Sequence, residues 1–184
     1  MGDYRACARM QASSTRDEAM TRRASFAALA RLAVAAAALI VSGAASAADL
    51  PTEFDPARDA AADVAHAVAL AKASGKRVIV DVGGEWCTWC HIMDRFIDAN
   101  DDVRALIDAH YVWVKVNFSK ENRNEVLLGR WPHIRGYPHL FVLDAQGALV
   151  HSQNTSTLES GKGYDKAKFI AMLRAWAPGR STKA

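Results

Sequence analysis

The sequence predicts an α/β fold in which helices flank a central, mixed β-sheet of four strands. Two nearly continuous β-branched runs, residues 77–83 and 111–118, indicate buried strands. Two further apolar segments enclose a turn at residues 145–147, which is typical of an antiparallel hairpin. Segments with helical periodicity precede, separate and follow these strands, and an α/β sandwich accommodates this order.

The first predicted helix follows a short N-terminal lead. Asp55 and Pro56 are a typical cap and first-turn pair, so we expect the helix to begin there and to run to about Ser74. Gly75 is well placed to end it, because glycine adopts the left-handed conformation at low cost. The run over residues 77–83 then contains few polar residues, which indicates a central strand that is buried on both faces.

The middle of the chain predicts two helices and a second strand. A Gly-Gly pair ends the first strand, and residues 87–99 form the next predicted helix. A further helix fits residues 101–110, with an Asn or Asp as its cap. Residues 111–118 form another β-branched and aromatic run, which indicates a strand. Residues 119–133 are polar and irregular, with room for one helical turn.

The end of the chain predicts the hairpin and a closing helix. Residues 139–144 and 148–153 are the two hairpin strands, joined by a turn that contains Gly147. Residues 164–177 form an amphipathic helix, since their apolar side chains recur at helical spacing: Phe169, Met172, Leu173 and Trp176.

Residues 1–47 are predicted to be separate from the folded domain. From Met20 onward, two arginines, an apolar run and a final Ala-Ser-Ala follow in the order of a secretory signal, with cleavage expected after Ala47. A membrane anchor is the alternative, although the apolar run is short for a membrane core of about 30 Å. We therefore expect a periplasmic or secreted protein, with Met20 as an alternative start and one domain over residues 48–184.

Charge excludes two classes of partner for this domain. Six of the 23 Lys and Arg residues and three of the 20 Asp and Glu residues lie within residues 1–47. Residues 48–184 therefore carry 17 residues of each sign, and the net positive charge of the whole chain belongs to the leader. Nothing in this balanced charge indicates a nucleic acid or an anionic membrane surface as a partner. We expect no nucleic-acid partner and a monomer.

The segment GEWCTWCHIM carries the strongest chemical signal. Cys87 and Cys90 are two residues apart, which is the spacing of a redox dithiol, and Cys7 lies in the predicted leader. An exported protein meets an oxidising compartment, but a disulfide across so small a loop stabilises a fold little. These two thiols therefore indicate thiol–disulfide exchange rather than a structural cross-link.

The position of the two cysteines predicts different roles for them. Cys87 lies between a strand end and a helix start, where unpaired N–H groups and the helix dipole stabilise a thiolate. Such a site lowers a cysteine pKa from its ordinary value of about 8.5. We expect Cys87 to be the exposed, attacking sulfur. Cys90, one turn further on, is expected to be more buried and to resolve the mixed disulfide.

Two metal-based alternatives follow from His91, which comes directly after the second cysteine. C-x-x-C-H is also the pattern of c-type haem attachment, but haem needs a second axial ligand and a large apolar pocket, and the strand leading into the motif leaves little room. Zinc would find donors at Cys87, Cys90 and His91, yet adjacent helical residues diverge by about 100°. We therefore predict no metal and no cofactor.

From about Arg77 to its end, the sequence resembles the thioredoxin family. Asp81 lies six residues before the first active-site cysteine and Trp86 directly precedes it, offsets at which thioredoxins carry a buried acid and a tryptophan. The segment VKVNF matches a family strand that keeps a lysine near that acid, and IRGYPHLFVLDAQG resembles the second family signature. Thr88 and Trp89 replace the Gly-Pro usual in thioredoxins, and WCTWCH is nearer to a branch of exported bacterial thioredoxin-like proteins.

The resemblance implies roles for further residues around the dithiol. Asp81, buried beneath the sulfurs, would have a raised pKa and take the proton of Cys90, and Lys115 would hold this acid in place. Pro138 would be a cis-proline beside the dithiol. It would leave the backbone of Tyr137 free to pair with a substrate peptide as an extra strand.

The roles of the remaining aromatic and histidine side chains stay open in the sequence. Trp86 and Trp89 fit either a contact surface for a partner or the packing of a helix end. His91 fits a helix-surface position near the thiols. His139, beside the expected cis-proline, is expected to modulate the site or to face solvent.

Taken together, the residues and the resemblance predict an exported thiol–disulfide oxidoreductase that acts on other proteins. No dissociable cofactor is expected, but a redox partner must restore the dithiol, and a reducing role would need a membrane electron donor. The direction of electron flow is left open. The alternative is a thioredoxin-like binding module without turnover, against which the presence of both Cys87 and Cys90 argues.

Overall fold

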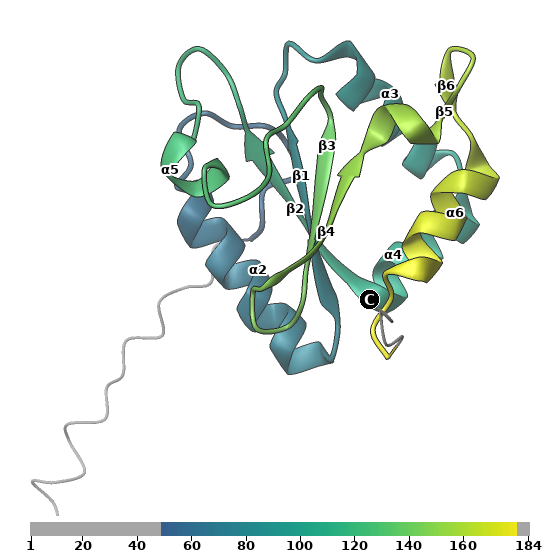
Figure 1. Ribbon diagram of the computed structural model, residues 1–184, viewed down its shortest axis with the longest axis horizontal. Helices are drawn as coiled ribbons and strands as arrows, with labels where there is room; N and C mark the ends of the chain where they lie inside the picture. The colour runs from purple at the N-terminus through teal and green to yellow at the C-terminus, as the bar shows by residue number, and fades with distance from the viewer. Residues whose placement is uncertain (1–48, 180–184) are drawn as a thin grey trace, which may run out of the picture. The chain divides into compact units, whose positions relative to one another are not determined.

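The computed structural model describes residues 49–179, and its centre is one mixed sheet (Figure 1). Its strands lie in the order β2-β1-β3-β4. β1 is parallel to β2 and antiparallel to β3, which is antiparallel to β4. This confirms the predicted α/β fold with a four-stranded mixed sheet flanked by helices. The strands are β1 (Arg77–Gly83), β2 (Tyr111–Asn117), β3 (His139–Leu143) and β4 (Leu149–Asn154).

One face of the sheet is covered by the helix α2 (Ala60–Ser74). The carboxylate of Asp59 accepts hydrogen bonds from the backbone N–H groups of the helix's second and third residues, and Gly75 ends the helix at φ +68°. The predicted end is confirmed, but the predicted start at Asp55 and Pro56 is wrong. The Asp55 carboxylate accepts from Ala57 N in a separate turn, so the helix begins about one turn later.

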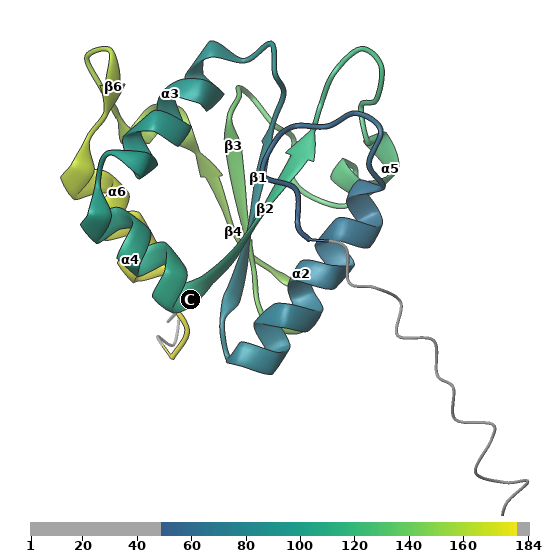
Figure 2. The same cartoon turned by 180° about the vertical axis from the view of Figure 1, so that it is seen from behind.

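Three helices cover the opposite face: α3 (Thr88–Asp98), α4 (Asp101–His110) and α6 (Lys166–Ala175). Figure 2 shows them together on one side of the sheet, with α2 on the other. Successive residues of β1 alternate between the two cores, because side chains on a strand point alternately to opposite faces. Val78, Val80 and Val82 pack toward α2, whereas Ile79 packs toward α4 and α6.

Two short pieces complete the described fold. Between β2 and β3, residues 118–138 contain a single helical turn, α5 (Glu125–Leu128), in the segment that was predicted to be irregular. After β4, a 3₁₀ turn, η2 (Thr155–Leu158), leads into a hairpin of two-residue strands, β5 (Glu159–Ser160) and β6 (Gly163–Tyr164). The hairpin lies beside α3 and was not predicted, because two-residue strands show no periodicity.

The N-terminal predictions concern a part of the chain about which the structure gives no information. The secretory signal, its cleavage after Ala47 and the alternative start at Met20 lie outside the described residues. Within residues 49–179, no helix has the length and apolar character needed to cross a membrane.

Candidate active site

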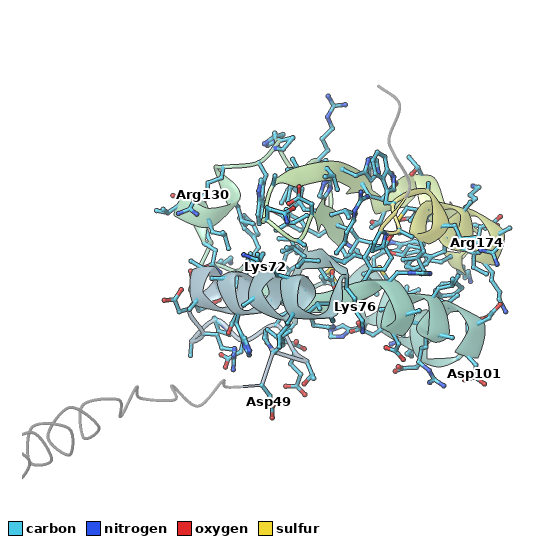
Figure 3. The ribbon with its side chains drawn as sticks, turned by 90° about the horizontal axis from the view of Figure 1, so that it is seen from below. Asp49, Lys72, Lys76, Asp101, Arg130 and Arg174 are labelled. Atoms are coloured by element: carbon cyan, nitrogen blue, oxygen red, sulfur yellow. A yellow bond between two sulfur atoms is a disulfide. The ribbon has the colours of Figure 1, made fainter. Side chains whose placement is uncertain are left out.

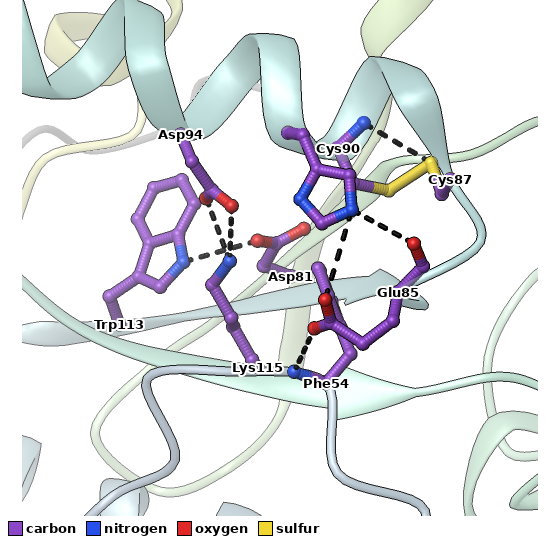
Figure 4. A network of polar contacts seen from close by, with 9 residues as sticks. Phe54, Asp81, Glu85, Cys87, Cys90, Asp94, Trp113 and Lys115 are labelled. Atoms are coloured by element: carbon purple, nitrogen blue, oxygen red, sulfur yellow. Dashed lines mark hydrogen bonds and ion pairs between the residues drawn. A yellow bond between two sulfur atoms is a disulfide. The ribbon is translucent and has the colours of Figure 1, made fainter.

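Cys87 and Cys90 form a disulfide at the start of α3, where the chain leaves β1 (Figure 4). Cys87 is the N-terminal cap of the helix, and its sulfur accepts a hydrogen bond from Cys90 N at 3.2 Å. Cys90 is fully buried, and Cys87 retains 4% of its surface. The predicted order of burial is therefore confirmed, but Cys87 is buried in the disulfide form and not exposed, contrary to the prediction.

The two glycines that end β1 allow the backbone to approach the disulfide and its neighbours closely. A Cβ atom on Gly83 would lie 2.4 Å from Cys90 Sγ and 3.0 Å from Phe54 Cζ. A Cβ atom on Gly84 would lie 2.4 Å from Trp86 Nε1 and 2.9 Å from the backbone oxygen of Phe118. Neither position has room for a side chain. The Gly-Gly pair, which the sequence marks as a strand end, is therefore also a spatial requirement of the site.

Asp81 is fully buried on the same face of β1 as Gly83, which lies under the disulfide. Trp113 Nε1 donates to its Oδ2 at 3.4 Å, and within the described residues Oδ1 has no hydrogen-bond partner. Burial raises the pKa of Asp81 from 3.8 to about 7, against the opposing effect of the Lys115 ammonium. A carboxyl group in this state can gain or lose a proton near neutral pH, as was predicted for the acid beneath the dithiol.

The predicted role of Lys115 requires a correction. Its ammonium does not hydrogen-bond to Asp81 but contacts both carboxylate oxygens of Asp94, on α3, at 2.7 Å. The side chain of Asp94 is 33% exposed, whereas Asp81 is fully buried, and an ion pair costs less desolvation at the more exposed position. Lys115 still lies opposite Asp81 in the β1–β2 register, so its charge acts on that acid without a direct bond.

The N-terminal lead closes one side of the site. The ring of Phe54 is buried against the two cysteines, and the Lys115 ammonium lies 4.3 Å from the centre of this ring. The backbone N–H of Phe54 donates to Glu85 Oε1 at 3.0 Å, and His91 Nε2 lies 2.9 Å from the Glu85 backbone oxygen. His91 therefore fixes the loop before the disulfide, and the side chain of Glu85 fixes the N-terminal lead over it.

An open groove runs along the side of the site where Asp94 and Lys115 lie. It has a volume of about 800 Å³ and runs between the N-terminal lead, α3, α4 and the edge strand β2. Asp94, Lys115, Trp113 and His91 line it, while Asp81 does not. Protons can therefore reach the surroundings of the buried acid from this side.

The predicted partner-contact residues divide into two groups. Trp86 is 56% exposed, donates from Nε1 to the Phe118 backbone oxygen at 2.7 Å, and meets the ring of Tyr137 edge-on at 5.5 Å. Tyr137 packs against the disulfide cluster, and the Tyr137–Pro138 peptide bond is cis. Trp89 is half-buried and packs edge-on against Tyr164 of β6. Trp86 and Tyr137 thus form surface beside the disulfide, whereas Trp89 packs against both the disulfide cluster and the hairpin.

The two histidines considered for metal or modulating roles, His91 and His139, make other contacts. Those of His91 with the Glu85 backbone are described above. His139 is 4% exposed and lies on the α2 face of the sheet with Phe141, so the expectation that it faces solvent is wrong, and its modulating role stays a prediction. Its Nε2 lies 2.9 Å from Ser152 Oγ, and burial lowers its pKa to about 4. Within residues 49–179, no group of three or more His, Cys, Asp or Glu side chains is arranged to hold a metal ion.

Sequence reasoning missed Phe54, Glu85, Asp94 and Trp113. One signal was available for Asp94, which lies four residues after Cys90 and so on the same side of the helix. Phe54 is more than thirty residues from the disulfide in sequence, and only the path of the N-terminal lead brings it there. No local pattern indicates a contact of that kind.

Comparison with known proteins agrees with this geometry. A family model described as thioredoxin-like matches residues 59–145. The chain is 28% identical over 108 residues to the thiol:disulfide interchange protein DsbD of Klebsiella pneumoniae, which covers 59% of this chain and 17% of that protein. It is 29% identical over 79 residues to DsbD of Salmonella typhi, covering 43% of this chain and 14% of that one. The chain thus spans about a sixth of the length of these curated relatives.

Solved structures show the same fold. A disulphide isomerase from Xylella fastidiosa superposes with a TM-score of 0.58 and 25% identity, over 69% of this chain and 96% of that one. The C-terminal domain of Neisseria meningitidis DsbD in its oxidised form gives a TM-score of 0.50 and 20% identity, over 67% of this chain and 98% of that one. The Cys-x-x-Cys disulfide at the head of α3, the fold and the family match over residues 59–145 are all thioredoxin-like.

Proposed function

We propose that this protein is an exported thiol–disulfide oxidoreductase that exchanges its disulfide with the thiols and disulfides of other proteins. The observation that carries the proposal is the placement of the Cys87–Cys90 disulfide at a helix N-terminus, on the same side of β1 as an acid whose pKa is about 7. A structural cross-link of three-residue separation needs no such acid. The similarity to proteins named thiol:disulfide interchange protein and disulphide isomerase supports the same chemistry.

The two sulfurs act in sequence when the protein reduces a substrate. The Cys87 thiolate, favoured by the helix N-terminus, attacks one sulfur of the substrate disulfide, and the other substrate sulfur leaves and takes a proton from solvent. The Cys90 thiol then gives its proton to ionised Asp81 and attacks Cys87 Sγ, which releases the second substrate sulfur. Two electrons pass from the dithiol to the substrate, and oxidation of a substrate dithiol is the same sequence reversed.

The partners of the reaction are two classes of protein. The substrates are proteins with accessible thiols or disulfides, whose backbone pairs with that of Tyr137 beside the disulfide. A second protein restores the redox state after each turnover, and for a reductant in the periplasm this is a membrane electron donor. We propose the periplasm as the location, from the secretory-signal pattern and the resemblance to DsbD. We expect the protein to act as a monomer.

The proposal is tested by trapping the covalent intermediate. Reduced Cys90→Ser protein should form a mixed disulfide through Cys87 with protein substrates, detected by mass spectrometry, and Cys87→Ser should form none. Wild-type protein should reduce insulin disulfides. If no adduct forms at Cys87, or if Cys87→Ser keeps full biological activity, the protein is a binding module and the proposal fails.

The direction of electron flow is measured separately. Equilibration with glutathione gives the reduction potential, which is about −270 mV for thioredoxin-type reductants and about −120 mV for a strong oxidant.

A further inference from the structure

The segment between β2 and β3 forms a second surface beside the disulfide, on the side opposite the hairpin. It presents two open cavities, of about 450 and 420 Å³, both of which are lined by Phe118 and Arg123. The larger is bounded by Leu128, Trp131 and Tyr137 among others, and the smaller by Trp86. We call this region, residues 118–137 together with Trp86, the aromatic–arginine surface.

This surface is continuous with the reactive disulfide. Tyr137 packs against the disulfide cluster, stacks on Phe118 at 4.9 Å and meets Trp86 edge-on at 5.5 Å. The three rings therefore lie between the two cysteines and the cavities. A polypeptide that is bonded to Cys87 and extends toward this side runs over these rings and brings its neighbouring side chains to the cavities.

The lining of the larger cavity suits a large apolar side chain. Its walls come from three aromatic rings and two aliphatic side chains, and it is open to solvent: Phe118, Leu128, Trp131, Ile134 and Tyr137. These three rings are half-buried. Aromatic rings that keep an accessible face supply much of the contact energy in protein recognition, because they bury a large area at little entropic cost. Trp86, at 56% exposure, extends the apolar area toward the disulfide.

The charge of the surface is positive, although that of the domain is balanced. Residues 118–137 contain four cationic side chains, Lys120, Arg123, Arg130 and Arg135, against two acids, Glu121 and Glu125. The Arg123 side chain is 60% exposed and lies 3.8 Å from Glu125, an exposed and therefore weak ion pair. Its guanidinium is thus available to a carboxylate of a partner at the edge of both cavities.

We propose that the aromatic–arginine surface selects protein substrates whose reactive cysteine lies in an acidic segment with a large apolar side chain nearby. The apolar side chain enters the cavity between Phe118 and Tyr137, and a carboxylate of the same segment pairs with Arg123. This inference rests on the proposed function and names its substrate class. The exchange itself is unchanged. The Cys87 sulfur bonds to one sulfur of the substrate disulfide and displaces the other.

The test uses four synthetic peptides, each with one cysteine disulfide-bonded to a small uncharged thiol. Their flanking residues combine either Glu or Lys with either Phe or Ser. The rate of exchange with the reduced protein is measured for each peptide, with hydroxyethyl disulfide as an uncharged reference. We expect the Glu–Phe peptide to react fastest and to exceed the Lys–Phe peptide by about fivefold at low salt, as one exposed ion pair allows. This factor should approach one in 1 M salt.

Two charge reversals localise the effect. Arg123→Glu should abolish or invert the preference for Glu over Lys. Arg174→Glu, on α6, is the matched control and should leave it unchanged. Figure 3 places Arg174 at the opposite end of the molecule from Arg130, which belongs to the aromatic–arginine surface. The preference for Phe over Ser is measured by comparing the peptides on the wild-type protein. No apolar residue of the cavity therefore has to be substituted.

Each outcome separates this inference from the proposed function. Equal rates for all four peptides, or a preference for Lys, would overturn the inference while leaving the exchange activity intact. A Glu preference that survives Arg123→Glu would overturn the role of Arg123. If neither the peptides nor hydroxyethyl disulfide react, the proposed function itself fails. A shift from dimer to monomer on Arg123→Glu, measured by light scattering, would assign the surface to a second copy of this chain and overturn the inference.

Discussion

Replacing Asp81 by asparagine should stabilise the protein at neutral and alkaline pH and leave it almost unchanged in acid. The pKa of this carboxyl is 3.8 in an unfolded chain and about 7 in the folded protein. The folded state therefore binds the proton more tightly, and stability falls as pH rises between these two values. At 1.36 kcal/mol per pKa unit, the ionised carboxyl costs about 4 kcal/mol above pH 7. The amide of the Asp81→Asn variant carries no charge at any of these pH values and avoids this cost.

Urea unfolding of the oxidised protein at several pH values measures this difference directly. The free-energy gap between Asp81→Asn and wild type should be near zero at pH 4, grow toward pH 7 and then stay constant. Asp108→Asn, an exposed acid of α4, is the control and should change stability by less than about 0.5 kcal/mol at every pH. A gap that is the same at pH 4 and pH 8, or a less stable variant at pH 8, would refute the reasoning.

Three further substitutions test the surroundings of the disulfide. Gly83→Ala places a methyl group 2.4 Å from a disulfide sulfur and should lower the stability of the oxidised protein by about 1–3 kcal/mol in urea unfolding, whereas Gly136→Ala, with open space around it, should not. Asp94→Asn removes a charge that raises the pKa of Asp81, so the pH dependence of insulin reduction should move to lower pH; an unchanged or higher midpoint would contradict this. Phe54→Ala should cost about 3–5 kcal/mol through the cavity it leaves, and a loss under 1 kcal/mol would show that the N-terminal lead does not seal the site.

The four strands of the sheet and the β3–β4 hairpin could be predicted because their signals are local. A β-branched run such as residues 77–83 has few alternatives to a buried strand, and a short turn between two apolar segments specifies an antiparallel pair. The helix α4 was predicted at its observed bounds, residues 101–110, for the same reason. The start of α2 was misplaced because Asp55 and Asp59 are both good caps, and the choice between them depends on where the N-terminal lead packs.

The chemistry of the site could be predicted from the sequence, but its side-chain contacts could not. Cys87, Cys90 and Asp81 follow from spacing and resemblance, and the structure places them together. The pairing of Lys115 depends on competition between two acids, which is decided by solvent access: Asp94 opens to the groove and Asp81 does not. Its outcome can be predicted only if the burial of each acid in the folded protein is known, and the sequence alone does not give that burial.

The charges around the disulfide also support the different roles proposed for the two sulfurs. Cys87 lies at the N-terminus of α3, and its sulfur accepts a hydrogen bond from the N–H of Cys90 at 3.2 Å. A helix N-terminus stabilises a negative charge by about 0.3–2 kcal/mol. Cys90 lies on the side of Asp81, whose ionised form is already costly, so a second negative charge there is opposed as long as Asp81 is ionised. In the proposed mechanism the thiolate is therefore favoured at Cys87, and Cys90 attacks only as its proton passes to Asp81. The part of this asymmetry that comes from Asp81 should weaken below pH 7 as that acid becomes neutral.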